Sequence, residues 1–318
     1  MDFTLFKQTN RIANLVFTDE AIRLAEVKQG NPFQVVNLEE KLLPAGVISD
    51  GKIQDRETLE MILEEIIALW GLKKRKVRFV APDMYIVIRK MLIPSDIAED
   101  EVRNYLFLEI GNSIHLPFED PLFDYLLLEE KEGKQEILLF ASPEEVVLSY
   151  QEILEDVKLQ PIAADISPLC LYRFYHGMQM TNGQNHEMIL HFDKKLLTLT
   201  IFNHHRPIFL RPLSLQGENG VIVTEQEESV LFSLEDTFKE VEKVMNFYRY
   251  TLNKDEASVN KVFVIGDHPH LSEIFDHLND RFDVRVESMP IIESYNKDDA
   301  LLDPKFVVAI GLGLKEVI

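Results

Sequence analysis

Three short segments, each at the end of a predicted strand, lie where a nucleotide-binding protein would place the turns that hold phosphate. They read VFTD at 16–19, HFDK at 191–194 and VIGDH at 264–268. Phosphate binding needs a tight turn with inward-facing backbone N–H groups, and glycine lets the main chain come that close. The first two segments lack a glycine, and the third retains only Gly266. The pattern therefore predicts a binding protein rather than a catalyst.

Other catalytic or metal-binding patterns are absent from the sequence. It contains no G-x-S-x-G motif, no Cys/His nucleophile pattern and no P-loop. Histidines recur at 204–205 and 268–270, with His277 nearby, but no pair has a recognised zinc spacing. We interpret them as polar loop residues and expect no metal site, although a zinc site is the alternative that metal analysis would reveal.

Composition and charge limit the classes of partner. The chain has 318 residues, 46% of them hydrophobic, and a net charge of -21. Nucleic acid is disfavoured because its phosphates require clustered lysine and arginine. The cluster at 73–76 is interpreted as a solvated turn, with an anionic-lipid contact as the alternative. Cys170 is the single cysteine, which fits a reducing cytoplasm.

The ends and the apolar runs indicate no membrane span. No apolar run approaches the roughly 20 residues that a transmembrane helix needs. Residues 1–11 lack the features of a secretory signal and are expected to be a short loose end, with a weak surface anchor as the alternative.

Hydrophobic periodicity predicts two lobes of the same kind. Strands at 14–43 form an antiparallel meander followed by a helix from Asp55 and another strand, and a second meander at 188–213 repeats this order. This order of elements in each lobe, a meander followed by a helix and a strand, is typical of the α/β actin-like (ribonuclease H-like) architecture. We expect lobe one at 1–82 and 158–180, lobe two at 181–318, and an inserted β-α-β-β-α subdomain at 83–157.

Several segments resemble the PilM family, the cytoplasmic actin-like component of type IV pilus assembly. The segment LPAGVISDGKIQD at 43–55 is similar to a family motif nearly residue for residue. Further likeness lies in Ile93-Pro94, in LPF at 116–118, in PIAAD at 161–165 and in AIGLG at 309–313. The resemblance implies a role in assembling a type IV or competence pilus. The alternative within the same architecture is a component similar to GspL of type II secretion.

The chain departs from the family at the nucleotide site. Two family turns that carry an aspartate and a glycine align with residues 16–18 and 191–193 of this chain. Neither segment keeps that aspartate at its place in the turn or the glycine. The predicted degenerate site comprises Val16, Thr18, His191, Asp193, Gly266 and Asp267. We therefore expect neither ATP nor Mg²⁺ as a cofactor and no enzymatic activity, with a divergent actin-like ATPase as the alternative.

The inserted subdomain carries the partner-binding prediction. By resemblance, a groove there would hold the extended N-terminal tail of the inner-membrane protein PilN, with apolar side chains filling pockets. The candidate contact residues are Val102, Leu106, Phe107, Leu116 and Phe118. The alternative is that this helical stripe packs the subdomain core. The resemblance also implies a location at the inner face of the cell membrane through partners, with the pilus motor ATPase as a second partner.

Overall fold

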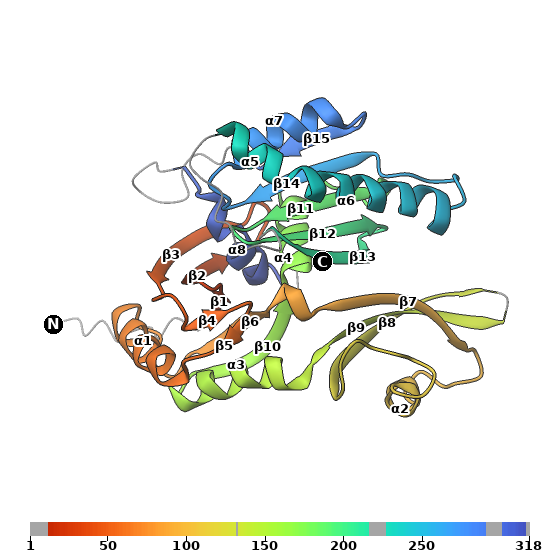
Figure 1. Ribbon diagram of the computed structural model, residues 1–318. Helices are drawn as coiled ribbons and strands as arrows, with labels where there is room; N and C mark the ends of the chain where they lie inside the picture. Colours follow the sequence, from red (N-terminus) through yellow and green to blue (C-terminus); the bar gives the residue numbers. More distant parts are fainter. Residues whose placement is uncertain (1–11, 132, 216–226, 291–300, 316–318) are drawn as a thin grey trace.

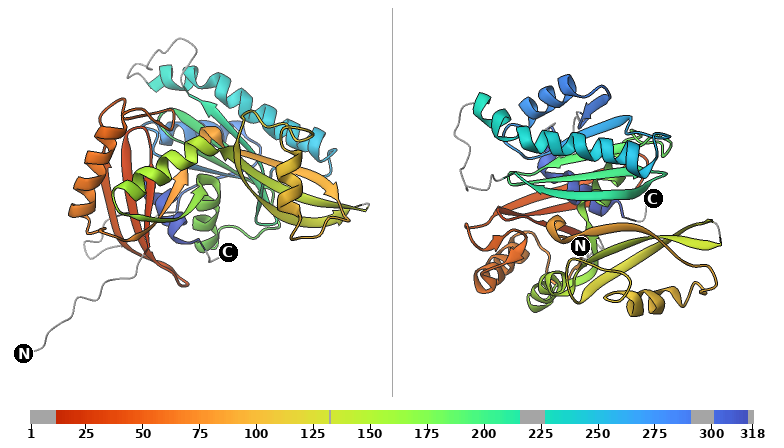
Figure 2. Two further views of the ribbon diagram at one scale, coloured as in Figure 1. Left: turned by 90° about the horizontal axis from the view of Figure 1, so that it is seen from below. Right: turned by 45° about the vertical axis from the view of Figure 1, so that its right-hand side comes forward.

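The computed structural model describes residues 12–131, 133–215, 227–290 and 301–315 (Figure 1). Two five-stranded sheets form the centres of two lobes, and a three-stranded sheet extends from the first lobe beneath the second (Figures 1 and 2). None of the helices in these ranges is long and apolar enough to cross a membrane.

The two large sheets have the same strand order. The first runs β10-β6-β1-β2-β3 and the second β13-β12-β11-β14-β15. In each, an antiparallel meander is followed by two strands added in parallel on the other side of its first strand. The first sheet consists of β1 (Ala13–Phe17), β2 (Ala21–Lys28), β3 (Gln34–Leu42), β6 (Lys76–Ala81) and β10 (Gln160–Ile166). The second consists of β11 (Glu187–Phe192), β12 (Leu196–Asn203), β13 (Arg206–Ser214), β14 (Lys261–Gly266) and β15 (Arg285–Ser288).

The outer face of the first sheet is covered by α1 (Arg56–Leu69), which follows the small hairpin β4 (Ile48–Ser49) and β5 (Lys52–Ile53). The Asp55 carboxylate caps α1 by accepting a hydrogen bond from the Thr58 N–H at 3.0 Å. Beyond the helix, Gly71 takes a φ of +66°, which suits glycine at a helix C-terminus. The start of α1 therefore agrees with the helix predicted from Asp55.

The small subdomain consists of β7 (Val87–Pro94), α2 (Val102–Glu109), β8 (Pro121–Lys131) and β9 (Lys134–Pro143), with the strands in the order β7-β9-β8. A 3-10 turn, η1 (Asp83–Tyr85), leads into it. Helix α2 packs on one face of the sheet, where Val102 and Leu106 join a core with Ile93 and Leu139.

The following helix belongs to another core. Helix α3 (Glu144–Asp156) buries Val147, Tyr150 and Leu154 among residues of the first lobe. This differs from the expected unit of residues 83–157, because the apolar stripe of α3 faces the first sheet rather than the small one. The compact subdomain therefore ends near Pro143.

Two helices fill the space between the large sheets. They are α4 (Ser167–Gly177) and α8 (Val307–Gly313), the latter preceded by η3 (Pro304–Phe306). A Cβ on Gly311 would lie 1.9 Å from the Cys170 carbonyl oxygen, so the two helices touch through their backbones. Their core includes residues from both sheets, which joins the lobes.

The second lobe is covered on its outer side by α5 (Glu227–Ser233), α6 (Glu235–Asn246) and α7 (Leu271–Arg281). Helix α6 continues as a π-helical turn, η2 (Phe247–Leu252), so the hydrogen-bond pattern of the helix changes there.

Candidate functional site

A cavity of about 140 Å³ lies between the lobes, where strands of both sheets end. Every residue predicted for the degenerate nucleotide site lines this cavity. They are Val16, Thr18, His191, Asp193, Gly266 and Asp267. The three segments that the sequence singled out are therefore brought together, as in a two-lobed protein with an interlobe site.

The first turn satisfies its N–H groups within the chain. The Thr18 hydroxyl accepts hydrogen bonds from the N–H groups of Glu20 at 3.3 Å and Ala21 at 3.0 Å. The Asp19 carboxylate accepts from the N–H groups of Asp50 at 2.9 Å and Gly51 at 3.0 Å. Backbone donors of the kind that bind phosphate are thus engaged by side chains of the protein.

The third segment keeps its glycine for a packing reason. Gly266 has a φ of +142°, and a Cβ there would lie 1.9 Å from the Phe192 carbonyl oxygen. That same oxygen accepts hydrogen bonds from the N–H groups of Asp267 and His268, both at 3.1 Å. The close approach of β14 to the end of β11 therefore requires Gly266.

A buried arginine connects the two sides of the cleft. Arg23 on β2 is 7% exposed and forms an ion pair with Asp267, the residue after β14. Its Nε donates to Glu40 on β3 at 3.0 Å, and its Nη1 donates to the Lys305 carbonyl at 3.3 Å. Burial alone would lower the pKa of Arg23, but the charge of Asp267 and hydrogen bonds to Glu40 and Asp267 raise it overall. Arg23 is therefore held as a cation.

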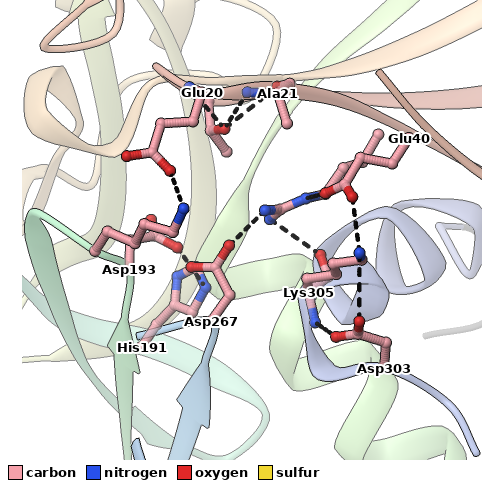
Figure 3. A network of polar contacts seen from close by, with 11 residues as sticks. Glu20, Ala21, Glu40, His191, Asp193, Asp267, Asp303 and Lys305 are labelled. Atoms are coloured by element: carbon pink, nitrogen blue, oxygen red, sulfur yellow. Dashed lines mark hydrogen bonds and ion pairs between the residues drawn. The ribbon is translucent and has the colours of Figure 1, made fainter. Parts of the chain in front are cut away.

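The network extends from Glu40 to the segment before α8. Lys305 Nζ donates to the Glu40 carboxylate at 2.7 Å and lies 3.4 Å from Asp303 (Figure 3). Burial opposes ionisation of Glu40, but its bonds with Lys305 and Arg23 lower its pKa. The carboxylate is consequently charged and shared between two cations.

A second set of ion pairs joins the two hairpin turns. Lys194, in the turn between β11 and β12, pairs with Glu20 in the turn between β1 and β2 (Figure 3). The neighbouring Lys195 lies 3.7 Å from Asp19. The acidic turn of the first lobe therefore faces the basic turn of the second lobe.

Two further acids lie at the cleft in surroundings that disfavour their charge. Burial, followed by the nearby carboxylates Asp267 and Asp83, raises the pKa of Asp193 to about 6, although His191 opposes the shift. Asp193 lies 3.4 Å from His191 Nε2. Burial also raises the pKa of Asp83, whose carboxylate accepts hydrogen bonds from Ser167 and, at 3.0 Å, from Thr198. The cleft thus holds two acids whose charged forms are disfavoured by burial.

Metal binding has no support in the described ranges. No group of three or more His, Cys, Asp or Glu side chains there could hold a metal ion. In the His268 and His270 pair, the rings lie 6.0 Å apart, and His270 is beside Glu273 at 3.7 Å.

A larger cavity of about 770 Å³ lies on the small subdomain. We call it the subdomain groove. Its walls come from the end of α2, the loop 110–120 and the starts of β8 and α3, and it is lined by Phe107, Ile110, Gly111, His115, Leu116, Pro117, Phe118, Glu119, Asp120, Pro121, Phe123 and Glu144.

The predicted partner-binding residues divide between the subdomain groove and the core beneath it. Phe107, Leu116 and Phe118 line the groove, and Phe107 is 72% exposed. Val102 and Leu106 are only 1% and 0% exposed and pack in the subdomain core. Only the first three could touch a docked segment without unfolding of α2.

Comparison with known families assigns the chain. A family model described as "Type IV pilus assembly protein PilM" matches residues 15–229, more than half of the sequence. The chain belongs to the PilM family. A search of curated proteins gives no match.

Solved structures show the fold of this PilM-family protein. A PilM–PilN type IV pilus biogenesis complex is similar with a TM-score of 0.78 and 19% identity, and the match covers 96% of this chain and 98% of that chain. MreB5 of Spiroplasma citri bound to ADP has a TM-score of 0.51 at 11% identity, with 97% of each chain covered. The ethanolamine utilization protein EutJ of Carboxydothermus hydrogenoformans has a TM-score of 0.50 at 10% identity, covering 96% of this chain and 89% of that chain. The two-lobed actin-like α/β fold is thereby confirmed.

Sequence reasoning missed the cations of this PilM-family cleft. Arg23, Lys194, Lys195 and Lys305 all line the cavity, as does the buried Asp83. Arg23 carried a weak signal, because a charged residue interrupts the apolar run of β2. Lys305 carried none, because its partner Glu40 is 265 positions away in the chain.

Proposed function

We propose that this PilM-family protein is a non-catalytic scaffold of type IV or competence pilus assembly. In this role it holds the extended N-terminal tail of a PilN-like inner-membrane protein in the subdomain groove. The observation that carries the proposal is a contrast between two cavities. The interlobe cleft is a cavity of about 140 Å³ crossed by the protein's own ion pairs, whereas the subdomain groove is a cavity of about 770 Å³ with the exposed Phe107 on its wall.

The cleft supports the non-catalytic part of the proposal. Turn N–H groups that could bind phosphate are bonded to Thr18 and Asp19. The carboxylate of Asp267 forms an ion pair with Arg23. Entry of Mg-ATP would require these bonds to break and buried charges to separate, which is strongly unfavourable.

The groove supports the binding part of the proposal. Extended peptides dock by main-chain hydrogen bonds and by side chains that enter pockets. Phe107, Leu116 and Phe118 provide apolar walls for such pockets. The similar solved structure is a complex of PilM with PilN, which makes a PilN-like tail the partner of choice.

In this proposal the protein is peripheral to the inner face of the cell membrane, where its partner holds it. The remaining surface is then available to a second partner in the cytoplasm, for which we propose the pilus motor ATPase. A pull-down of the motor ATPase by the protein, with and without the PilN-like tail, tests this second contact.

The test of tail binding compares two adjacent residues of α2. Phe107 lines the subdomain groove, whereas Leu108 does not, although it is similarly exposed at 67%. The probe is a synthetic peptide of the cytoplasmic tail of the PilN-like protein from the same organism, and its Kd is measured by fluorescence anisotropy. We expect Phe107→Asp to weaken binding by about tenfold or more and Leu108→Asp to have little effect. Equal affinities for both folded variants and the parent protein would remove the groove from the proposal.

The test of catalysis is a thermal shift with Mg-ATP. A ligand at a hundredfold excess over its Kd stabilises the folded state by about 2.7 kcal/mol. We expect no shift of Tm at millimolar Mg-ATP and no phosphate release. A clear rise in Tm would favour the divergent ATPase instead.

A further inference from the structure

The subdomain groove is lined by apolar side chains and by three carboxylates. The charged side chains that line it are all carboxylates, Glu119, Asp120 and Glu144, and within the described chain no lysine or arginine lines it. The apolar lining is formed by Phe107, Leu116 and Phe118 together with Ile110, Phe123 and two prolines, Pro117 and Pro121.

The local chain path brings the backbone of Glu144 next to that of Asp120, the neighbour of Glu119. The Glu144 N–H, at the start of α3, donates to the Asp120 carbonyl at 2.9 Å, next to the pairing of Pro121 with Pro143. None of the three forms an ion pair with another residue in the described ranges. Glu144 interacts favourably with the N-terminus of α3, but Glu119 and Asp120 lie outside any helix. The helix dipole therefore does not account for two of the three charges.

The loop beside these carboxylates has main-chain groups available to a partner. In the part of the chain that the structure describes, the backbone of residues 116–119 makes no hydrogen bond to another residue. An extended segment laid along this loop could form such bonds, as in other cases of peptide addition. The whole chain carries a net charge of -21, which attracts a cationic segment over a longer range.

We propose that the segment held in the subdomain groove is a cationic apolar peptide. Its apolar side chains enter the pocket beside Phe107 and Phe118, and at least one lysine or arginine pairs with Glu119, Asp120 and Glu144. This inference rests on the proposed function and specifies the chemistry of the partner's tail. Charge selects the tail and sets its direction in the groove, while apolar contact supplies most of the affinity.

The decisive variant removes two charges with little change of shape. It is Glu119→Gln with Asp120→Asn, and asparagine tolerates the φ of 45° found at residue 120. The matched control is Glu129→Gln with Glu130→Gln, two adjacent exposed carboxylates near the other end of β8. Both variants lose two negative charges, so the net charge of the protein changes equally.

The measurement is the Kd of the PilN-like tail peptide between 20 mM and 500 mM salt for parent, variant and control. We expect a loss of about fivefold at low salt for the Glu119/Asp120 variant, a flatter salt dependence, and a control close to the parent. A peptide whose lysines and arginines are replaced by glutamine should bind the parent with about the same Kd as the original peptide binds the variant, and it should lose nothing further on the variant.

The outcomes separate this inference from the function on which it rests. Tight peptide binding with the same Kd and salt slope for parent and variant would overturn the charge assignment and leave the proposed function intact. A parent protein that does not bind the peptide would overturn both. Self-association of the parent that excludes the peptide would assign the groove to a second copy of the chain and would also overturn the inference.

Discussion

Arg23 and Asp267 form an ion pair across the interlobe cleft although 244 positions separate them in the sequence. The arginine comes from the meander of the first lobe, and the aspartate follows a central strand of the second. In a nucleotide-binding protein of this shape, a ligand between the lobes contacts both of them. Here, two side chains of the protein itself connect the lobes at this position.

The buried ion pair leads to a first prediction. Replacing Arg23 by Met leaves the carboxylates of Glu40 and Asp267 without their shared cation. Removal of one partner from a buried pair destabilises by roughly 3–5 kcal/mol, because an uncompensated charge remains. We expect Arg23→Met to lower the free energy of unfolding by about 3 kcal/mol, measured by urea denaturation.

A surface pair provides the control for Arg23. Arg211 lies 3.0 Å from Glu240, but its side chain is 48% exposed. Arg211→Met should change the free energy of unfolding by less than about 0.5 kcal/mol. The double variant Arg23→Met with Asp267→Asn should be less unstable than the sum of its single variants. Strict additivity would mean that the two residues are energetically independent, contrary to the structure.

Asp193 leads to a prediction of pH dependence. Its pKa is raised in the folded state from an ordinary 3.8 to about 6, mainly by burial. Between these values the folded state binds more protons than the unfolded state, so the contribution of Asp193 to stability falls as pH rises through the window. Asp193→Asn removes the effect. We expect the variant to match the parent near pH 4 and to exceed it by about 1–2 kcal/mol at pH 7, allowing for the partial exposure of the side chain.

The measurement for Asp193 is the difference between two stability curves, each from urea denaturation at several pH values. Subtracting the variant from the parent removes the contribution of the other titrating groups. A difference that does not vary between pH 4 and pH 7 would show that the Asp193 pKa is ordinary.

Gly266 leads to a prediction about backbone approach. A methyl group there would meet the Phe192 carbonyl oxygen at 1.9 Å. Gly266→Ala must therefore displace β14 from β11 and should cost roughly 3 kcal/mol or more, or prevent folding. The matched control is Gly46→Ala, which also has a positive φ of +87° but has nothing within 4 Å. We expect the control to lower the free energy of unfolding by only about 1 kcal/mol. Thermal or urea unfolding of both variants measures the two effects. Equal effects would mean that φ strain alone matters at Gly266.

The sequence predicted those cleft residues whose positions depend on local patterns. Val16, Thr18 and His191 were placed at strand ends by short-range periodicity, and the repeated meander indicated two lobes of the same kind. The ion pairs could not be predicted in this way. The contact of Arg23 with Asp267 depends on how two sheets pack through α4 and α8, and no local pattern encodes that orientation.

The small subdomain shows a second limit. The apolar stripe of α2 correctly identified a helix with one buried face, but spacing alone does not tell which neighbour that face meets. Val102 and Leu106 pack against the small sheet, whereas the groove uses Phe107 on another side of the helix. Likewise, α3 follows the small sheet in the chain, but its Tyr150 packs with the first lobe.

The final prediction tests this orientation of α2. Leu106 is fully buried, so Leu106→Ala should lower the free energy of unfolding by roughly 2–5 kcal/mol through lost contacts and a cavity. Phe107 is the next residue but is 72% exposed, so Phe107→Ala should stay within about 0.5 kcal/mol of the parent. Urea denaturation of both variants gives the comparison. The peptide assay should show the opposite order at low temperature, where both proteins are folded, because only Phe107 lines the groove. If Leu106→Ala kept parental stability, α2 would have to be rotated from the position described, and the groove would then have different walls.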